Sequence, residues 1–145
     1  MAGEPTGWAE WVERLARLVP GLTRYQDREG LRETDKQVRV CLAGRLAELR
    51  RDLEAAARVL TDGGDLSRLP ALDRVGRVLA RLGDQIRFAS YGYAGVFDLR
   101  KIRETELCTL HRFDVTLLEE VPRLGERVQA LAEAARTGEA FPAAL

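Results

Sequence analysis

Three residues in the second half of the chain have side chains that bind metal ions in many proteins. Glu104, Cys108 and His111 lie at positions i, i+4 and i+7, so they share one face of a helix. A carboxylate, a thiolate and an imidazole at that spacing are able to hold zinc or another divalent cation with one coordination position open. However, the chain has a single histidine and no Glu-x-x-His pair of the kind that bridged-metal bundles use. We therefore expect a solvated face with a half-buried thiol, and keep the metal site as an alternative.

Asp114 is the fourth member of that alternative set. It lies seven residues after Leu107 and seven before Val121, on or beside an apolar seam. A carboxylate in such a position needs partners, because burying it alone is costly. His111 is one candidate, and an arginine from another helix is a better one, because a guanidinium group binds a carboxylate through two hydrogen bonds. We predict a structural ion pair rather than a catalytic acid.

The stretch ASYGYAGVFD at 89–98 gathers aromatic residues and glycines in an otherwise leucine- and arginine-rich chain. We interpret it as a corner in which Gly95 ends one helix and Asp98 begins the next. Phe88 and Tyr91, three residues apart, form a second apolar face beside this corner. Packing against another helix of the chain is favoured over an external ligand as the partner of that face.

The apolar residues repeat with a helical period, and no alternating run has the length of a strand. The predicted elements are a short amphipathic helix at 7–19, a hairpin of helices at 24–61 and 70–94, a helix at 99–136 and a loose tail at 137–145. Pro122 is expected to kink the last helix, because proline removes a backbone donor. These elements predict a single all-α domain over residues 1–145, a bundle of three or four helices.

The hairpin is predicted from two seams of apolar residues that follow one another at spacings of three or four. The first seam consists of Val38, Leu42, Leu46, Leu49, Leu53, Ala56 and Leu60, and the second of Leu72, Val75, Leu79, Leu82, Ile86, Ala89 and Tyr93. In the last helix Phe113, Leu117 and Val121 are counted among the apolar positions. Capping boxes at Thr23 and Thr34 offer two starts for the second helix, and the phase of its seam favours the earlier one.

Composition narrows the range of partners. The 23 basic and 23 acidic side chains cancel, so no overall field attracts nucleic acid. The two cysteines, Cys41 and Cys108, form no CxxC pair, which suits a reducing compartment. The first residues also lack the basic and apolar regions of a signal peptide. We expect a cytoplasmic protein without nucleic-acid partners.

The first helix carries an apolar face that includes Trp8 and Trp11. Tryptophan favours membrane interfaces, but the charges on this helix are of both signs, so an anionic membrane gains little from it. Packing onto the bundle is therefore favoured over a membrane surface. Together with Phe88 and Tyr91, these two tryptophans are the candidate partner-binding residues.

The segments LVPGLTRYQDREGLRETDK, RFASYGYAGVFD and LHRFDVTLLEEV resemble those of a set of small, all-helical bacterial proteins of unknown function. The resemblance implies a bacterial source and an all-α fold, and it brings no activity with it. The chain contains no phosphate-binding, dinucleotide-binding, nucleophile-elbow or zinc-protease motif. We therefore predict no catalytic residue, no cofactor and no enzyme. The expected function is that of a helical adaptor that binds a protein partner or a second copy of itself, with a metal- or ligand-binding bundle as the alternative.

Overall fold

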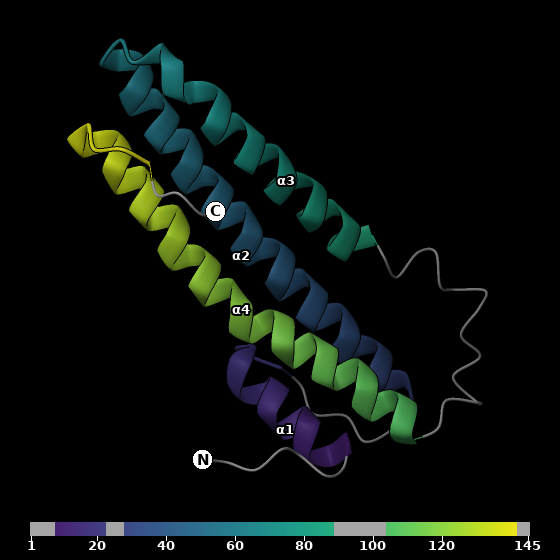
Figure 1. Cartoon of the computed structure of the whole chain (residues 1–145). Coiled ribbons are helices and arrows are strands. Elements are labelled where there is room, and N and C mark those ends of the chain that lie inside the picture. The colour runs from purple at the N-terminus through teal and green to yellow at the C-terminus, as the bar shows by residue number, and fades with distance from the viewer. Residues whose placement is uncertain (1–7, 23–27, 89–103, 142–145) are drawn as a thin grey trace. The chain divides into compact units, whose positions relative to one another are not determined.

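The computed structural model describes residues 8–22, 28–88 and 104–141, with the side chains at 8–9, 28–32 and 104–111 outside this description. Every regular element in the described part is a helix (Figure 1). The elements are α1 (Trp8–Leu18), α2 (Arg28–Asp62), the short 3-10 helix η1 (Leu66–Arg68), α3 (Leu69–Phe88) and α4 (Glu104–Thr137). The predicted all-α fold is confirmed.

The chain packs as two compact units, and both long helices contribute to each of them. The first unit consists of Met1–Leu42 and Arg87–Glu120, and the second of Ala43–Ile86 and Val121–Leu145. The first unit therefore contains α1 and the N-terminal parts of α2 and α4. The second contains the C-terminal parts of these two helices and most of α3.

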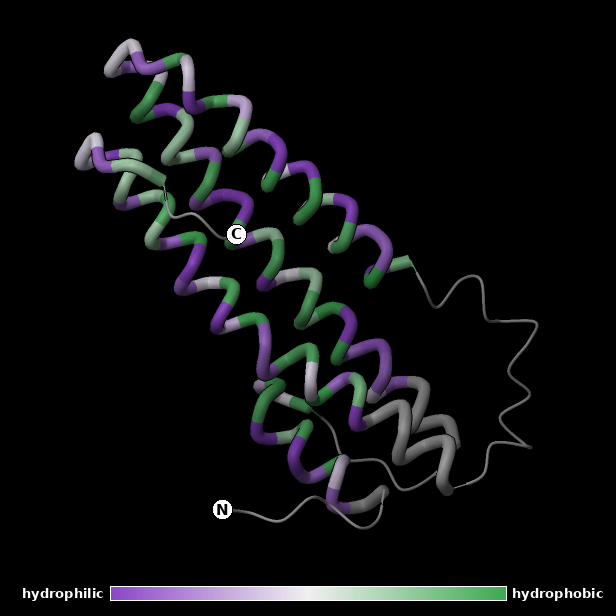
Figure 2. Tube along the Cα trace, in the orientation of Figure 1, coloured by the Kyte–Doolittle hydropathy of each residue, from purple (hydrophilic) through white to green (hydrophobic). Residues whose placement is uncertain are grey.

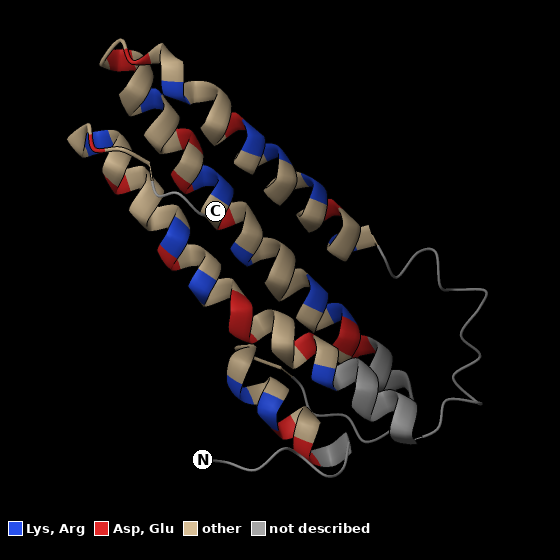
Figure 3. Cartoon of the chain, viewed as in Figure 1, with Lys and Arg blue, Asp and Glu red and all other residues tan. Residues whose placement is uncertain are grey.

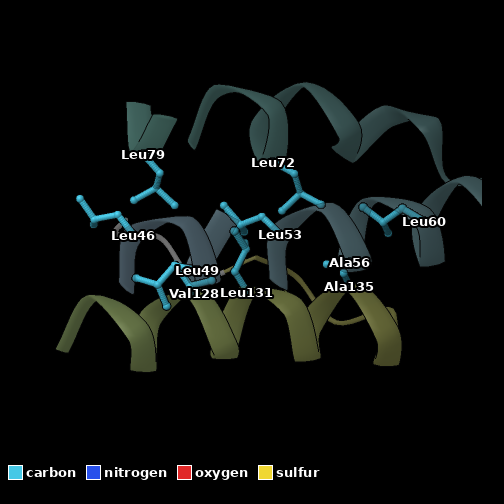
Figure 4. Close-up of a cluster of buried hydrophobic side chains, with 10 residues drawn as sticks. All are labelled: Leu46, Leu49, Leu53, Ala56, Leu60, Leu72, Leu79, Val128, Leu131 and Ala135. Atoms are coloured by element: carbon cyan, nitrogen blue, oxygen red, sulfur yellow. The ribbon is translucent and has the colours of Figure 1, made fainter. Parts of the chain in front are cut away.

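The core of the second unit is built from three helices, with α2 between α3 and α4 (Figure 4). Its buried residues are Leu46, Leu49, Leu53, Ala56, Leu60, Leu72, Leu79, Val128, Leu131 and Ala135. Within this unit α2 and α4 run in the same direction and α3 runs against them (Figure 1). Removing these aliphatic side chains from water stabilises the unit, at roughly 25 cal/mol for each Å² of apolar surface.

The turn between α2 and α3 is fixed by a glycine. Gly64 has a positive φ of 74°, a backbone conformation that residues with a side chain rarely adopt. Its N–H donates to the carbonyl of Thr61 at 3.1 Å, and the N–H of Asp65 donates to the carbonyl of Leu60 at 2.9 Å. This pair of bonds is the Schellman motif, which satisfies the last carbonyls of a helix. The predicted end of the second helix at Asp62-Gly63-Gly64 is confirmed.

The first unit buries one face of α1. Trp11, Val12, Leu15 and Val19 are buried there, and hydropathy changes from side to side around the described turns of the helix (Figure 2). Arg14 connects α1 with α4, because its Nε and Nη2 donate to Oε1 of Glu119 at 3.1 and 2.6 Å. The helix stops before Pro20-Gly21, as predicted.

Two apolar positions expected in the seams are exposed. Leu82 of α3 is 38% exposed and Phe113 of α4 is 61% exposed. Next to Phe113, the buried residues are Asp114, Val115 and Leu118. In both cases the predicted apolar stripe is wider than the face that neighbouring helices cover.

The start of α2 and the course of α4 bear on two of the predictions. α2 begins at Arg28, which is closer to the predicted start at Thr23 than to the one at Thr34. Thr34 therefore lies inside the helix and does not cap it. Thr34 is buried, at 1% exposure. α4 runs through Pro122 as one helix, and the kink at this residue stays a prediction.

Candidate functional site

The first unit contains a buried carboxyl group on α4. Asp114 is 6% exposed. The pKa of Asp114 is raised to about 7, mainly by burial and in addition by the Asp35 carboxylate on α2, while the Arg39 guanidinium acts in the opposite direction. The carboxyl group of Asp114 therefore takes up or releases a proton close to neutral pH.

Arg39, an arginine of another helix, acts on Asp114 through its charge and hydrogen-bonds an acid of its own helix, so the predicted ion pair with Asp114 stays a prediction. Its Nε donates to Oδ2 of Asp35 at 2.7 Å, one helical turn away. Among the described residues, Oδ2 of Asp114, Oδ1 of Asp35 and Oγ1 of Thr34 have no hydrogen-bond partner. Asp35, Arg39 and Asp114, together with Thr34, which directly precedes Asp35 on α2, are what we call the buried acidic cluster. Oxygen atoms of this kind hold a proton, a water molecule or a cation.

Three of the four predicted metal ligands lie outside the described side chains. Glu104, Cys108 and His111 belong to α4, but only its backbone is described there. No group of three or more histidine, cysteine, aspartate or glutamate side chains in the described part is arranged to hold a metal ion. The metal set with Asp114 therefore stays a prediction.

The predicted partner-binding residues fall in different surroundings. Tyr91 and the side chain of Trp8 lie outside the described part. Trp11 is 5% exposed, and the guanidinium of Arg14 lies 5.9 Å from its ring centre. Phe88, at the end of α3, is exposed. The Trp11 side chain is thus covered within the first unit, whereas a membrane-bound α1 would turn it outward.

The second unit exposes two aliphatic side chains on α3. Val78 is 60% exposed and Leu82 is 38% exposed, and residues four apart lie on one helix face, one turn from each other. We call this pair the α3 ridge. Leu72 and Leu79 hold another face of the same helix in the core, so the ridge is presented on a fixed element.

Arginines accompany the ridge. Arg74 and Arg81 are exposed, one turn before Val78 and three residues after it. Neither forms an ion pair with a described residue, whereas the next arginine, Arg77, pairs with Asp73 at 2.5 Å. Basic residues occur along the whole of α3, with one acidic residue near each end (Figure 3). The ridge is therefore an apolar pair accompanied by two arginines that form no ion pair in the described part, although Asp73 and Asp84 lie on the same helix.

The second unit also has an open groove between α2 and α4. It has a volume of about 590 Å³. The residues lining it are Asp52, Ala55, Ala56, Val59, Gln129, Ala130, Ala132, Glu133 and Arg136. We call it the alanine groove, because four of its residues are alanines, whose small side chains let another segment come close. Asp52 on the α2 wall forms no ion pair in the described part, and Glu133 on the α4 wall pairs with Arg136 at 2.5 Å.

Neither the α3 ridge nor the alanine groove was predicted from the sequence. The seam pattern assigned Leu82 to the core and gave Val78 no role. A signal for the groove was present in the run Ala55-Ala56-Ala57 of α2, because consecutive alanines place small residues on more than one helix face. The opposing Ala130 and Ala132 are 73 residues or more further along, and only the fold brings them to the same groove.

No protein-family model, no curated protein and no solved structure matches the chain. None of the described helices combines the length and the hydropathy needed to cross a lipid bilayer.

Proposed function

We propose that the protein is a non-enzymatic helical interaction module that binds protein partners through the α3 ridge. The observation that carries this proposal is the exposure of Val78 and Leu82, at 60% and 38%. Adjacent large aliphatic side chains that face solvent on a folded helix are typical of a surface that another protein covers. Self-association is one form of this function.

The way α3 is held supports the proposal. Leu72 and Leu79 anchor α3 in the core, and the Schellman turn at Gly64 fixes the connection before it. A helix that is already ordered loses little conformational entropy when a partner binds it. An amphipathic partner helix would place its own apolar side chains against Val78 and Leu82.

Site-specific photo-cross-linking tests this function. A benzoylphenylalanine residue at position 78 is expected to give discrete cross-linked products in cells of the source organism. The matched control is the same residue at position 84, because Asp84 is exposed on α3 about 120° around the helix from Val78. If the two positions give the same products, or position 78 gives none, the ridge is not an interaction surface.

A second candidate function is the binding of a cation or a small ligand at the buried acidic cluster. It is favoured by the three oxygens of Thr34, Asp35 and Asp114 that have no described partner. Under this proposal Cys108 and His111, which precede Asp114 on α4, supply further ligands.

Metal analysis of protein purified without an affinity tag tests this second function. We expect a stoichiometric metal in the wild-type protein and its loss in Asp114→Asn. Asp84→Asn serves as the control, because this carboxylate is exposed on α3. A wild-type protein free of metal, which also fails to bind added Zn²⁺ or Mg²⁺ in a calorimetric titration, contradicts the proposal.

A further inference from the structure

The α3 ridge and the alanine groove belong to the same unit and differ in the size of their side chains. The ridge carries two branched side chains one helical turn apart. The groove has alanines on both walls and Val59, which is 40% exposed, among its lining residues. Helices approach one another closely when the aliphatic side chains of one helix pack among small residues of the other.

We propose that the alanine groove of one copy of this chain receives the α3 ridge of a second copy. This inference rests on the proposed function and names its partner. Val78 and Leu82 cannot reach the groove of their own chain, because α3 is held by Leu72 and Leu79 in the core of the same unit. A second copy is therefore required to bring the two surfaces together.

The charges of the two surfaces are also complementary. Arg74 and Arg81 accompany the ridge, and neither has an ion-pair partner in the described part. The groove offers Asp52 without such a partner, and Glu133 paired with Arg136. Docking brings two guanidinium groups to a groove whose three charged lining residues sum to one negative charge. Opposite charges on facing surfaces fix the register of a contact and disfavour other partners.

The ridge and the groove are different surfaces, so the contact they form is heterologous. Each copy that docks its ridge leaves its own groove open to the next copy. Repetition of such a contact gives a closed ring or an open chain, and not a symmetric pair. This property separates the proposal from dimers in which one surface meets itself.

Native mass spectrometry of two variants and of their mixture tests the proposal. Val78→Glu with Leu82→Glu removes the ridge, and Ala55→Glu with Ala130→Glu blocks the groove. All four residues are exposed, and circular dichroism and urea unfolding verify that both variants are folded. Wild-type protein is expected to form dimers and longer species as its concentration rises, whereas each variant alone stays a monomer. An equimolar mixture is expected to form one-to-one heterodimers only, because the pair retains one intact ridge and one intact groove.

Charge reversal gives a second and milder test. Arg74→Glu with Arg81→Glu is expected to weaken self-association by about tenfold or more. Mixing this variant with Asp52→Arg, Glu133→Arg protein is expected to restore association between the two, whereas each variant alone associates more weakly than the wild type. A combination of Arg123→Glu and Arg127→Glu, two exposed residues of α4 outside the groove lining, serves as the control.

Several outcomes overturn the proposal. Wild-type protein that stays a monomer at its highest soluble concentration has no such contact. Self-association that survives in the groove variant shows that the ridge meets a second ridge or that another surface is used, and self-association that survives in the ridge variant shows the same for the groove. A mixture without heterodimers shows that the ridge of one copy does not dock in the groove of another. The broader proposed function fails separately, since it requires only that position 78 cross-link to some protein.

Discussion

Asp114 makes the stability of the folded state depend on pH. Its pKa is about 7 in the folded state, against an ordinary value of 3.8 for an aspartate in the unfolded chain. Below pH 3.8 the carboxyl group of Asp114 is protonated in both the folded and the unfolded chain. Its burial then does not destabilise the folded state, because the group carries no charge. Between the two values the unfolded chain loses its proton and the folded chain keeps it, so the free energy of unfolding falls as the pH rises. The loss is complete above the folded pKa and amounts to about 4 kcal/mol.

Asp114→Asn is expected to remove this pH dependence. The free energy of unfolding of the variant relative to that of the wild type should rise by about 1.4 kcal/mol per pH unit between the two pKa values. Urea unfolding followed by tryptophan fluorescence measures it, because Trp8 and Trp11 both belong to the first unit. Asp84→Asn is the control and should keep the wild-type profile. A profile of Asp114→Asn that parallels the wild type would show that the carboxyl group ionises normally.

Arg68 links four groups of the second unit. Its Nε donates to Oδ2 of Asp65 at 2.6 Å, its Nη1 donates to the carbonyls of Glu139 at 2.7 Å and Ala134 at 3.4 Å, and its guanidinium lies 4.8 Å from the ring centre of Phe141. The Ala134 carbonyl belongs to the last turn of α4, where helix carbonyls lack partners within the helix. The hydrogen bonds from Ser67 and Arg68 keep the pKa of Asp65 below its usual value.

Arg68→Lys is therefore not a conservative change. A lysine ammonium cannot reproduce the fork of donors or the planar contact with the ring, and we expect a loss of about 1–3 kcal/mol in the free energy of unfolding. Urea unfolding followed by circular dichroism measures this loss. Arg127→Lys, on an exposed position of α4, should change the free energy by less than about 0.5 kcal/mol. Equal effects of the two substitutions would mean that the contacts of Arg68 contribute nothing.

At the scale of the element, the seam of α2 was predictable to the residue. All seven predicted positions from Val38 to Leu60 are buried. The spacing of three and four keeps one helix face turned toward its neighbours, and here that face is covered throughout the described part of α2. The glycine-rich end of the helix was predictable for a local reason, since only a glycine adopts the positive φ of Gly64 without strain.

The seams of α3 and α4 were less predictable for a geometric reason. Periodicity identifies the apolar side of a helix, whereas the width of the buried stripe depends on how closely the neighbours approach. Leu82 is in phase with the core and still 38% exposed, and Phe113 is 61% exposed beside the buried Asp114. The candidate surfaces arise from this difference, because the ridge consists of apolar residues that the neighbouring helices leave uncovered.

Two glycines, one inside α2 and one just after its end, test how the backbone of this helix is stabilised. Gly44 lies inside the helix, with no atom within 4 Å of an added Cβ. Gly44→Ala is expected to stabilise the protein by about 0.5–1 kcal/mol, because glycine loses more conformational entropy in a helix. Gly64→Ala is expected to destabilise it by about 1 kcal/mol or more, because φ is 74° there. Thermal unfolding followed by circular dichroism compares the two, and a shift of the same sign in both would contradict this account.

The buried acidic cluster was only partly predictable from the sequence. The pattern predicted that Asp114 needs a partner and that an arginine of another helix would supply it. Asp35 and Arg39 are four residues apart on α2, which is typical of an ion pair within one helix. That they lie near Asp114, 75 residues or more further along the chain, follows only from the packing of α2 beside α4 in the first unit. Distances between positions so far apart are a property of the fold.

At the scale of the whole molecule, the chain divides into two units. The single domain over residues 1–145 that the sequence predicts stays a prediction, and the apolar seam of α2 runs through both units without a break. An unbroken seam shows that a helix is buried along its length, but it does not show which helix covers each part. In the first unit the buried residues come from α1, α2 and α4, and in the second from α2, α3 and α4. One continuous seam thus serves two cores.

The balance of charge over the whole chain bears on self-association. The formal net charge is zero at pH 7, so copies of the chain do not repel one another as strongly charged proteins do. The charged part of the proposed contact consists of exposed groups, whose interactions salt screens. Raising the salt concentration from about 0.05 M to about 0.5 M is therefore expected to weaken self-association by roughly three- to tenfold. Sedimentation velocity at a series of protein concentrations measures the change.

A variant without the ridge arginines isolates the charged part of this effect. Arg74→Gln with Arg81→Gln is expected to associate more weakly than the wild type at low salt and to lose most of its salt dependence. The apolar part of the contact, from Val78 and Leu82, responds in the opposite direction, because salts that are excluded from protein surfaces favour apolar burial. If wild-type association strengthens as salt is added, the contact is held by the aliphatic side chains, and Arg74 and Arg81 do not meet the acidic groups of the groove.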